Sequence, residues 1–240
     1  MARDPSVFVH TFALCESDEV GPRTRIWAFA HVLEGARIGA DCKVGGHSFV
    51  EGGVVVGDRV TIKNGVQLFS GVTVEDEVFL GPGAVFTNDA SPRAPYPKGP
   101  AGWRPTLVRR GATVGANATV LSGLTIGCWA MVGAGAVVTG DVPAHAVVVG
   151  NPARQTGWAC RCGRTLAFDR GTTPAVPRTP PILRGTTPAA APRTPPILRG
   201  TTPAVPRTPA GGLECPGCGR AWRLAAGTLE ERSSGAGQDG

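Results

Sequence analysis

Apolar residues recur at every sixth position through much of this sequence. From Phe8 to Phe86, each step of six lands on an apolar side chain, and the spacing resumes at Val108 and continues to Val138. In most of these hexads a small or aliphatic residue follows four positions later, as Ala30 follows Ile26. A period of six fits neither an α-helix nor the long alternating strands of a flat sheet. We therefore predict an all-β chain, a parallel β-helix in which each hexad forms a short strand and a turn.

The turns of this β-helix are predicted from the residues that follow each apolar position by three. Glycine, aspartate and asparagine are frequent there, and these residue types tolerate the left-handed backbone conformation of a tight corner. The positions include Gly35, Asp41, Gly53, Gly65, Gly71, Asp89, Asn117 and Asp141.

The six-residue spacing is interrupted between Phe86 and Val108. The intervening sequence includes "SPRAPYPKGPAGWRP", which is rich in proline and polar residues, so residues 87–107 are predicted to form a loop that leaves the β-helix. A long loop on a rigid scaffold is a common location for binding residues. The alternative is a solvated insertion with no role.

The segments "GPGAVFTND", "TLVRRGATVGAN" and "VGAGAVVTGDVPAHAVVVGNPAR" resemble the hexapeptide-repeat acyltransferases. The resemblance implies a left-handed β-helix over about residues 8–154, with three hexads in each coil and therefore six to seven coils. It also implies a homotrimer with acetyl-CoA bound between neighbouring subunits, and a loop that reaches a neighbour and helps to form the active site.

Within that family, "GPGAVFTN" together with "TLVRRGATVGAN" is similar to the N-acetyltransferases of nucleotide-linked amino sugars. The best-known type acts on UDP-2-acetamido-3-amino-2,3-dideoxy-glucuronate during surface polysaccharide (lipopolysaccharide) biosynthesis. Two positions depart from the pattern, since "GGHSFV" carries His47 in place of an amide and "RIWAF" carries Ala28 in place of histidine. The resemblance therefore does not fix the sugar.

Asn88 in "FTND" is the predicted catalytic residue. Its side-chain carbonyl can accept a hydrogen bond from the sugar amine and direct the nitrogen lone pair toward the thioester of acetyl-CoA. The alternative is a residue that only begins the loop. By the predicted columns, His31 lies on the same face as Asn88 but three coils away, which is too far for a base acting there in one subunit.

Other candidate residues follow from the resemblance or from their chemistry. The predicted substrate-binding residues are His31, Asn64, Glu75, Arg93 and Arg109, with corner or surface roles as the alternatives. The predicted cofactor-binding residues are Gly115, Gly133 and Gly135, through backbone N–H groups, together with Arg154.

The C-terminal region contains two close cysteine pairs, each followed by glycine. Thiolates from both pairs would form a structural zinc site, although the first pair has only one intervening residue: Cys160, Cys162, Cys215 and Cys218. Unpaired thiols or a redox pair are the alternatives. By contrast, Cys42 occupies a small inward position of the repeat and is predicted to lie in the core.

These patterns divide the chain into a β-helix domain (1–158), a split zinc-ribbon-like module (159–169 and 210–225) and two segments predicted to lack structure. The latter are the proline-rich tandem repeat 170–209 and the tail 226–240. The repeat holds six arginines and no acidic residue, so it accounts for the whole net charge of +6 and the rest is neutral. We therefore expect no nucleic-acid partner.

We expect a cytoplasmic enzyme, since the sequence shows neither a signal peptide nor an apolar run of about 20 residues. The leading function is acetyl-CoA-dependent N-acetylation of a nucleotide-linked amino sugar. The alternatives are an O-acetyltransferase of the same fold, a γ-type carbonic anhydrase, disfavoured because the four histidines include no pair five residues apart, and a non-enzymatic assembly subunit.

Overall fold

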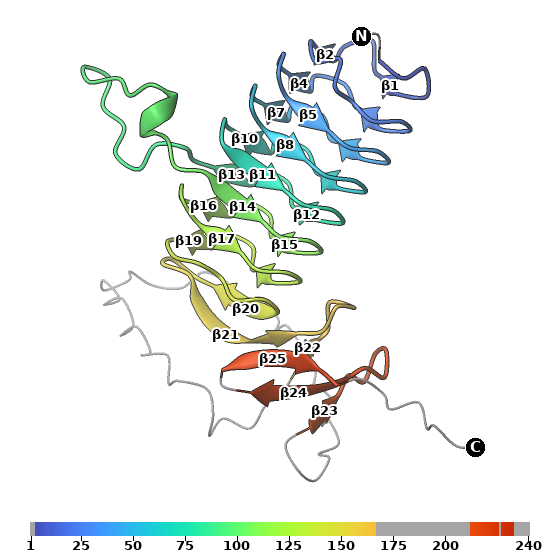
Figure 1. Ribbon diagram of the computed structural model, residues 1–240, viewed down its shortest axis with the longest axis vertical. Coiled ribbons are helices and arrows are strands. Elements are labelled where there is room, and N and C mark those ends of the chain that lie inside the picture. The colour runs from blue at the N-terminus through green and yellow to red at the C-terminus, as the bar shows by residue number, and fades with distance from the viewer. Residues whose placement is uncertain (1–2, 167–211, 226, 233–240) are drawn as a thin grey trace, which may run out of the picture.

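Three parallel sheets wind around one apolar interior. The computed structural model describes residues 3–166, 212–225 and 227–232, and Figure 1 shows the coils stacked from the N-terminus toward the C-terminal strands. Each full coil contributes one short strand to each sheet, and we call the sheets faces A, B and C. The predicted parallel β-helix is confirmed.

The strands of each face follow one another along the stack. Face A contains β1 (Phe8–Val9), β3 (Arg25–Ile26), β6 (Lys43–Val44), β9 (Thr61–Ile62), β12 (Phe79–Leu80), β15 (Thr113–Val114), β18 (Met131–Val132) and β20 (Ala146–Val149). Face B contains β2 (Leu14–Cys15), β4 (His31–Val32), β7 (Phe49–Val50), β10 (Gln67–Leu68), β13 (Val85–Phe86), β16 (Thr119–Val120) and β19 (Val137–Val138). Face C contains β5 (Arg37–Ile38), β8 (Val55–Val56), β11 (Val72–Val74), β14 (Thr106–Val108) and β17 (Thr125–Ile126).

The register confirms the predicted columns. On face B, His31 pairs with Phe49, Phe49 with Gln67, and Gln67 with Val85, each 18 residues further along the chain. The described residues form eight parallel strands on face A rather than the predicted six to seven coils. The additional coil is closed by β20, which lies beyond Val138, the last residue of the six-residue pattern.

The interior of the coils is filled by the predicted apolar positions. Ile26, Val32 and Leu80 are fully buried, as are the small residues Ala36 and Ala84 that follow other apolar sites. Cys42 is buried in this core, where its thiol lies 3.1 Å from the Gly57 carbonyl oxygen and burial raises its pKa to about 11. The core interpretation of Cys42 is therefore confirmed.

Left-handed residues mark the corners, but their identities differ in part from the prediction. Six of the eight expected positions have positive φ, whereas Asp89 and Asp141 do not. Bulky residues also adopt this conformation, among them Arg59 (φ 56°), Phe29 (φ 62°) and His47 (φ 58°). Because a left-handed conformation costs a residue with a Cβ about 1–2 kcal/mol, packing or function must hold these residues in place.

The excursion leaves the stack between β13 and β14 and contains one short helical turn, η1 (Pro100–Gly102) (Figure 1). Val74 pairs with Val108, which is 34 residues further along instead of 18, so the excursion adds 16 residues without disturbing the columns. The strand β14 begins at Thr106, one residue before the predicted end of the loop.

The C-terminal part adds antiparallel strands below the last coil (Figure 1). Strands β21 (Arg154–Ala159) and β22 (Thr165–Leu166) extend face A, and β23 (Gly212–Glu214), β24 (Ala221–Ala225) and β25 (Thr228–Glu231) form a separate sheet. The expectation of an unstructured tail from 226 is wrong for β25, which pairs with β24. The tandem repeat 170–209 lies outside the described residues. Within the described ranges, the structure has no helix with the length and apolar character needed to cross a membrane.

Candidate active site along the edges of the solenoid

The predicted site residues lie on different edges of the triangular coil. We name each edge by the two faces that it joins. Edge AB carries Asn64, Gly115, Gly133 and Gly135, edge BC carries Asn88, and edge CA carries Glu75 and Arg109. His31 lies on face B, between the first two edges. A single chain therefore does not bring the predicted catalytic and substrate-binding residues together.

A shallow pocket opens on edge AB over the first coils. Of its lining residues, only Asn64 was predicted to bind substrate. The lining comprises His10, Trp27, Ala28, Phe29, Gly46, His47 and Asn64. These residues come from four successive coils, so the sequence shows no continuous motif that would group them. Two of them, Ala28 and His47, are the positions at which the sequence departs from the amino-sugar motif.

One wall of this pocket is a column of stacked rings. Phe29 lies parallel to Phe12, with ring centroids 5.8 Å apart, and stacks on His47 at 4.9 Å. Phe29 is 56% exposed. Further along the same edge the left-handed corner residue is Gly65, then Gly83. The first coils thus place exposed rings where glycine would be unstrained, and such local strain is characteristic of binding sites.

The base of the pocket is flat because Gly46 lies between two coils. A Cβ at Gly46 would lie 2.6 Å from the Ala28 carbonyl oxygen, which the backbone could not accommodate. It would also lie 3.9 Å from the side-chain nitrogen of Asn64. The Asn64 amide therefore borders a surface formed largely by backbone, next to the stacked rings.

Asn88 lies at the base of the excursion, half-buried, where the chain leaves and rejoins edge BC. Its backbone carbonyl accepts a hydrogen bond of 3.0 Å from the amide of Arg104 on the returning segment. The neighbouring Asp89 is fixed by Lys98, whose Nζ donates to Asp89 Oδ1 at 2.7 Å and to Ser91 Oγ at 2.6 Å. The hydrogen bond from Lys98 lowers the pKa of the Asp89 carboxyl, as does the one from the Ser91 amide. The loop therefore holds Asn88 from both sides.

His31 lies on face B, as predicted, three strands from Val85, which is about 14 Å at the usual strand spacing. Its ring meets Phe49 edge-on at 5.7 Å, and its Nε2 lies 3.7 Å from a Glu16 carboxylate oxygen. Because Asn88 follows Val85 by three residues, His31 is too distant to act as a base at Asn88 of the same chain.

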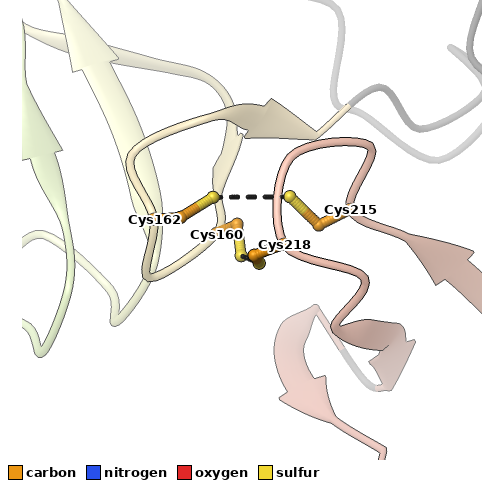
Figure 2. A group of neighbouring side chains, drawn as sticks. All are labelled: Cys160, Cys162, Cys215 and Cys218. Carbon is orange, nitrogen blue, oxygen red and sulfur yellow. Dashed lines mark hydrogen bonds between the residues drawn. The ribbon is translucent and has the colours of Figure 1, made fainter.

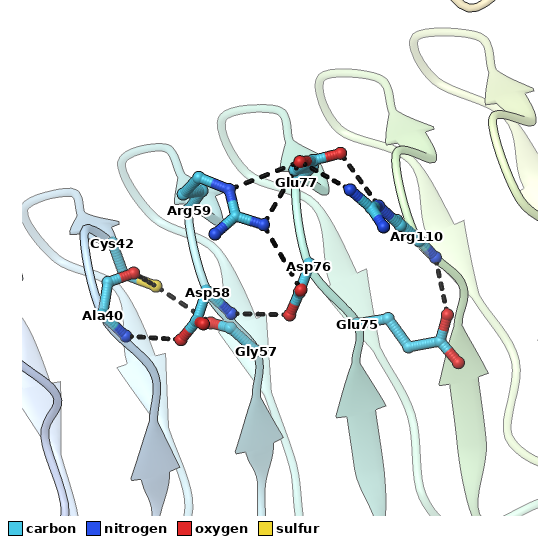
Figure 3. Close-up of polar contacts among 9 residues, drawn as sticks. All are labelled: Ala40, Cys42, Gly57, Asp58, Arg59, Glu75, Asp76, Glu77 and Arg110. Atoms are coloured by element: carbon cyan, nitrogen blue, oxygen red, sulfur yellow. Dashed lines mark hydrogen bonds and ion pairs between the residues drawn. The ribbon is translucent and has the colours of Figure 1, made fainter.

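Glu75 and Arg109 are brought together, but on edge CA. Their side chains approach to 3.6 Å, and Glu75 also accepts a 2.8 Å hydrogen bond from the amide of Arg110 in the next coil. Figure 3 shows related contacts at this edge, where the Asp58 and Asp76 carboxylates each accept from a backbone N–H of the preceding coil. Such contacts stabilise the corner, and both structural partners of Glu75, Arg109 and Arg110, lie in the next coil.

The remaining predicted residues are exposed or packed into the ladder. Arg93 is exposed on the loop and Arg154 is exposed on β21. The amides of Gly115, Gly133 and Gly135 donate to carbonyl groups of neighbouring coils at 2.8 Å each. Their backbone N–H groups are therefore already hydrogen-bonded within the β-helix. These glycines could contact a cofactor only because the absence of a side chain lets it come close to the backbone.

Comparison with known proteins agrees with this architecture. Two family models match, "Bacterial transferase hexapeptide (six repeats)" over residues 19–52 and "Hexapeptide repeat of succinyl-transferase" over residues 110–140. One relative is dTDP-3-amino-3,6-dideoxy-α-D-galactopyranose 3-N-acetyltransferase of Aneurinibacillus thermoaerophilus. It is 48% identical over 161 residues, which are 67% of this chain and 83% of the relative. The chain belongs to the hexapeptide-repeat acyltransferases.

Other similar proteins match over shorter shares of their length. Serine acetyltransferase 2 of Arabidopsis thaliana is 39% identical over 102 residues, which are 42% of this chain and 25% of that protein. A solved perosamine N-acetyltransferase of Caulobacter crescentus, in complex with CoA and GDP-perosamine, is 22% identical. That match covers 65% of this chain and 55% of the other, with a TM-score of 0.39.

The acyltransferase chain carries a further cluster at its C-terminal end. The four predicted metal ligands come together, with all four Sγ atoms within 4.8 Å of one another (Figure 2). The sequence left this grouping open because only one residue separates Cys160 from Cys162 in the first pair.

Proposed function

We propose that this chain transfers an acetyl group from acetyl-CoA to an amino group of a nucleotide-linked amino sugar, for surface polysaccharide biosynthesis. The observation that carries the proposal is the 48% identity with a curated N-acetyltransferase of a dTDP-linked 3-amino sugar, over 83% of that relative. A dTDP-linked 3-amino-deoxyhexose is therefore the first acceptor to test. The uronic acid acceptor suggested by the sequence motifs is the second.

The pocket on edge AB is suited to the nucleotide portion of such an acceptor. A nucleobase is planar, and the exposed Trp27 ring offers it a stacking surface beside the column formed by Phe12, Phe29 and His47. The exposed Asn64 amide can donate to and accept from the polar edge of a base or a sugar hydroxyl. Acetyl-CoA would lie farther along the same edge, where a Cβ at Gly135 would meet nothing within 4 Å.

Asn88 positions the reacting amine. The neutral amine attacks the thioester carbonyl carbon, so that a C–N bond forms and the carbonyl oxygen becomes an oxyanion. Collapse of this intermediate breaks the C–S bond, and the ammonium proton passes to the departing sulfur, which leaves as the thiol. The Asn88 side-chain oxygen accepts from the amine and keeps its lone pair directed at the carbonyl carbon, which lowers the entropic part of the barrier.

Assembly would complete the site, because Asn88 and the pocket lie on different edges of one chain. The outward column of face B contains no acidic residue, lysine or arginine, whereas the first positions of face A carry Arg25 and Lys43. The column runs through Leu14, His31, Phe49, Gln67, Val85, Thr119 and Val137. Such a column favours contact with a second copy. We therefore propose a homotrimer in which the loop of one subunit faces edge AB of its neighbour.

Turnover with defined acceptors tests the proposal. The purified protein and acetyl-CoA are incubated with a dTDP-linked 3-amino-deoxyhexose, with the UDP-linked 3-amino uronic acid and with the free amino sugar, and thiol release is measured. We expect turnover with a nucleotide-linked acceptor and at least tenfold less with the free sugar, because the free sugar cannot occupy the pocket. Release of thiol only with hydroxyl acceptors would instead identify an O-acetyltransferase.

The role of Asn88 is tested by Asn88→Ala beside His31→Ala. Loss of a contact made mainly in the transition state lowers kcat more than it raises KM, so Asn88→Ala should reduce kcat by roughly ten- to a thousandfold while acetyl-CoA still binds. His31→Ala should mainly raise the KM for the sugar nucleotide. Near-normal kcat in the first variant and nearly complete loss in the second would assign catalysis to the histidine.

A further inference from the structure

We propose that the cysteine cluster binds one Zn²⁺ ion, and that this ion fastens the C-terminal sheet to the last coil of the β-helix. The ligands are the thiolates of Cys160, Cys162, Cys215 and Cys218. The proposal is independent of the proposed transferase activity, because it depends only on these side chains and their surroundings.

The two cysteine pairs form equivalent turns despite their different spacing. In each turn the amide of the first cysteine donates to the carbonyl of a following arginine, Cys160 to Arg164 at 2.9 Å and Cys215 to Arg220 at 2.8 Å. In each turn a left-handed glycine, Gly163 (φ 85°) or Gly219 (φ 71°), donates back to the carbonyl of that cysteine. The shorter first turn therefore still presents both thiols on one side.

The sulfur–sulfur distances fit a tetrahedral tetrathiolate site. The Sγ atoms of Cys160 and Cys218 are 3.4 Å apart, and those of Cys162 and Cys215 are 3.5 Å apart (Figure 2). Zinc–sulfur bonds of about 2.3 Å at tetrahedral angles place the sulfur atoms about 3.8 Å apart. A disulfide would require about 2.05 Å, and all four cysteines are free.

The charges around the cluster complement a bound tetrathiolate, whose net charge would be −2. Arg220 Nη1 lies 3.5 Å from Cys218 Sγ, the geometry of an N–H donor to a metal-bound thiolate. Arg164 packs over the opposite turn, since a Cβ at Gly217 would lie 2.2 Å from its Nε. Both arginine side chains therefore lie at the second turn, and one of them, Arg164, comes from the first turn.

The position of the cluster indicates a structural role. Cys160 and Cys162 follow β21, which continues face A, whereas Cys215 and Cys218 connect β23 with β24. Beside the cluster, the buried Trp222 of β24 meets the ring of His145 in the last coil at 4.7 Å. Four protein ligands leave no open coordination position for a substrate or water, as in structural zinc sites. The ion would therefore hold the C-terminal sheet against the end of the stack.

Metal analysis of the full-length protein tests this proposal. Protein purified under reducing conditions should contain one zinc per chain, and Cys162→Ser and Cys218→Ser should reduce this to near none. Both replaced side chains are exposed, so neither leaves a buried cavity. Cys128→Ser, in the β-helix and outside the cluster, is the matched control and should retain one zinc per chain.

A measurement on the unaltered chain covers the case in which a variant fails to fold. Zinc is removed with a chelator and replaced by Co²⁺, which should give the visible absorption of tetrahedral thiolate coordination at one equivalent, and chelation alone should lower the melting temperature. Protein without zinc that also fails to bind Co²⁺, a red protein with one iron per chain, or mass evidence for disulfides between the pairs would each overturn the proposal.

Discussion

Phe29 and His47 combine three properties at the residue scale: each has a left-handed backbone, an exposed side chain and a place in the wall of the pocket. Arg59 has the same backbone conformation on edge CA, but its side chain forms ion pairs with Glu77 and Asp76 across neighbouring coils. Packing thus accounts for Arg59, whereas the ring of Phe29 contacts mainly other exposed rings. We therefore interpret the corner at Arg59 as structural and the corner at Phe29 as part of a binding site.

Replacement of Phe29 by glycine tests this distinction. Relief of the left-handed strain and the greater freedom of glycine in the unfolded chain oppose each other, so Phe29→Gly should change stability by no more than about 1 kcal/mol. The KM for the nucleotide-linked acceptor should rise at least tenfold, because the wall of the pocket loses the ring that lies between Phe12 and His47. Steady-state kinetics and thermal unfolding measure both effects.

Arg59→Gly is the matched control, since it removes a left-handed side chain from another edge. It should leave the acceptor KM unchanged. An equal rise in KM in both variants would show that the effect comes from a general loosening of the coils, and the pocket would lose its assigned role.

His145 makes the stability of the last coil depend on pH. Burial against Trp222 disfavours the charged ring and lowers its pKa from the ordinary 6.5. The unfolded chain then binds more protons in the interval below 6.5, so this contribution to stability is complete above pH 6.5 and decreases as the pH falls toward the folded pKa.

The imidazole contribution is isolated by His145→Asn. Asparagine tolerates the left-handed conformation of this corner (φ 64°), and the thiol cluster is unchanged in the variant. Between about pH 7.5 and about pH 5.5, the melting temperature of the variant should decrease less than that of the unaltered chain. His47→Asn, an exposed left-handed histidine, should retain the original pH dependence, and a flattened dependence there would contradict the assignment.

At the scale of elements, the loop between β13 and β14 is held at its base by one side chain. Lys98 reaches Asp89, the Ser91 carbonyl and the Ser91 hydroxyl, three acceptors within four residues of Asn88. The excursion is otherwise made of exposed residues, as the burial of residues 90–102 shows. The position of the Asn88 side chain therefore depends on this contact.

Lys98→Met removes the donors and keeps most of the aliphatic stem. We expect kcat/KM to fall by about tenfold, since misplacement of a reacting group by a fraction of an ångström has large effects on rate, with little change in melting temperature. Lys63→Met, an exposed lysine on a coil, is the control and should leave the rate constants unchanged. Unchanged kinetics in Lys98→Met would mean that the loop positions Asn88 without this ion pair.

The sequence predicted the solenoid because each apolar hexad position must point inward for neighbouring coils to bury one another, as Ile26, Val44 and Ile62 do. It did not reveal the pocket, because the lining residues are scattered over four coils and come together only when the coils pack on one another. It also missed β25, since Thr228–Glu231 is short and its partner strand is set by tertiary pairing with β24. Bulky left-handed residues such as Trp129 (φ 58°) give no compositional signal.

At the scale of the whole molecule, the chain consists of a rigid stack and a C-terminal sheet connected through the tandem repeat. The cluster joins the two sides directly: Cys162 and Cys215 are 53 positions apart along the chain, but their sulfur atoms are 3.5 Å apart. The repeat has no periodic apolar positions. Its length therefore matters little to the fold, since the entropy of closing a loop grows only slowly with length.

Joining Asp169 directly to Gly211 should leave zinc content, melting temperature and acetyl transfer close to those of the full chain. A second chain, in which residues 170–210 are replaced by a glycine–serine linker of equal length, separates the effect of composition from that of length. A large loss of activity in both chains would show that the repeat itself takes part in function, whereas loss only in the shortened chain would show that the connection became too short.

The placement of the cysteines also sets an order on folding during synthesis. Each coil pairs only with its neighbours, so the stack can grow coil by coil as the nascent chain leaves the ribosome. Cys160 and Cys162 emerge with the last coil, but their partners follow only after the whole repeat has been translated. During that interval the end of the stack lies open, with the face of His145 that Trp222 later covers exposed to solvent. Once the second pair has been translated, reduced thiols and available zinc would determine how soon the C-terminal sheet covers this end of the stack. Until then the chain could aggregate through its open end.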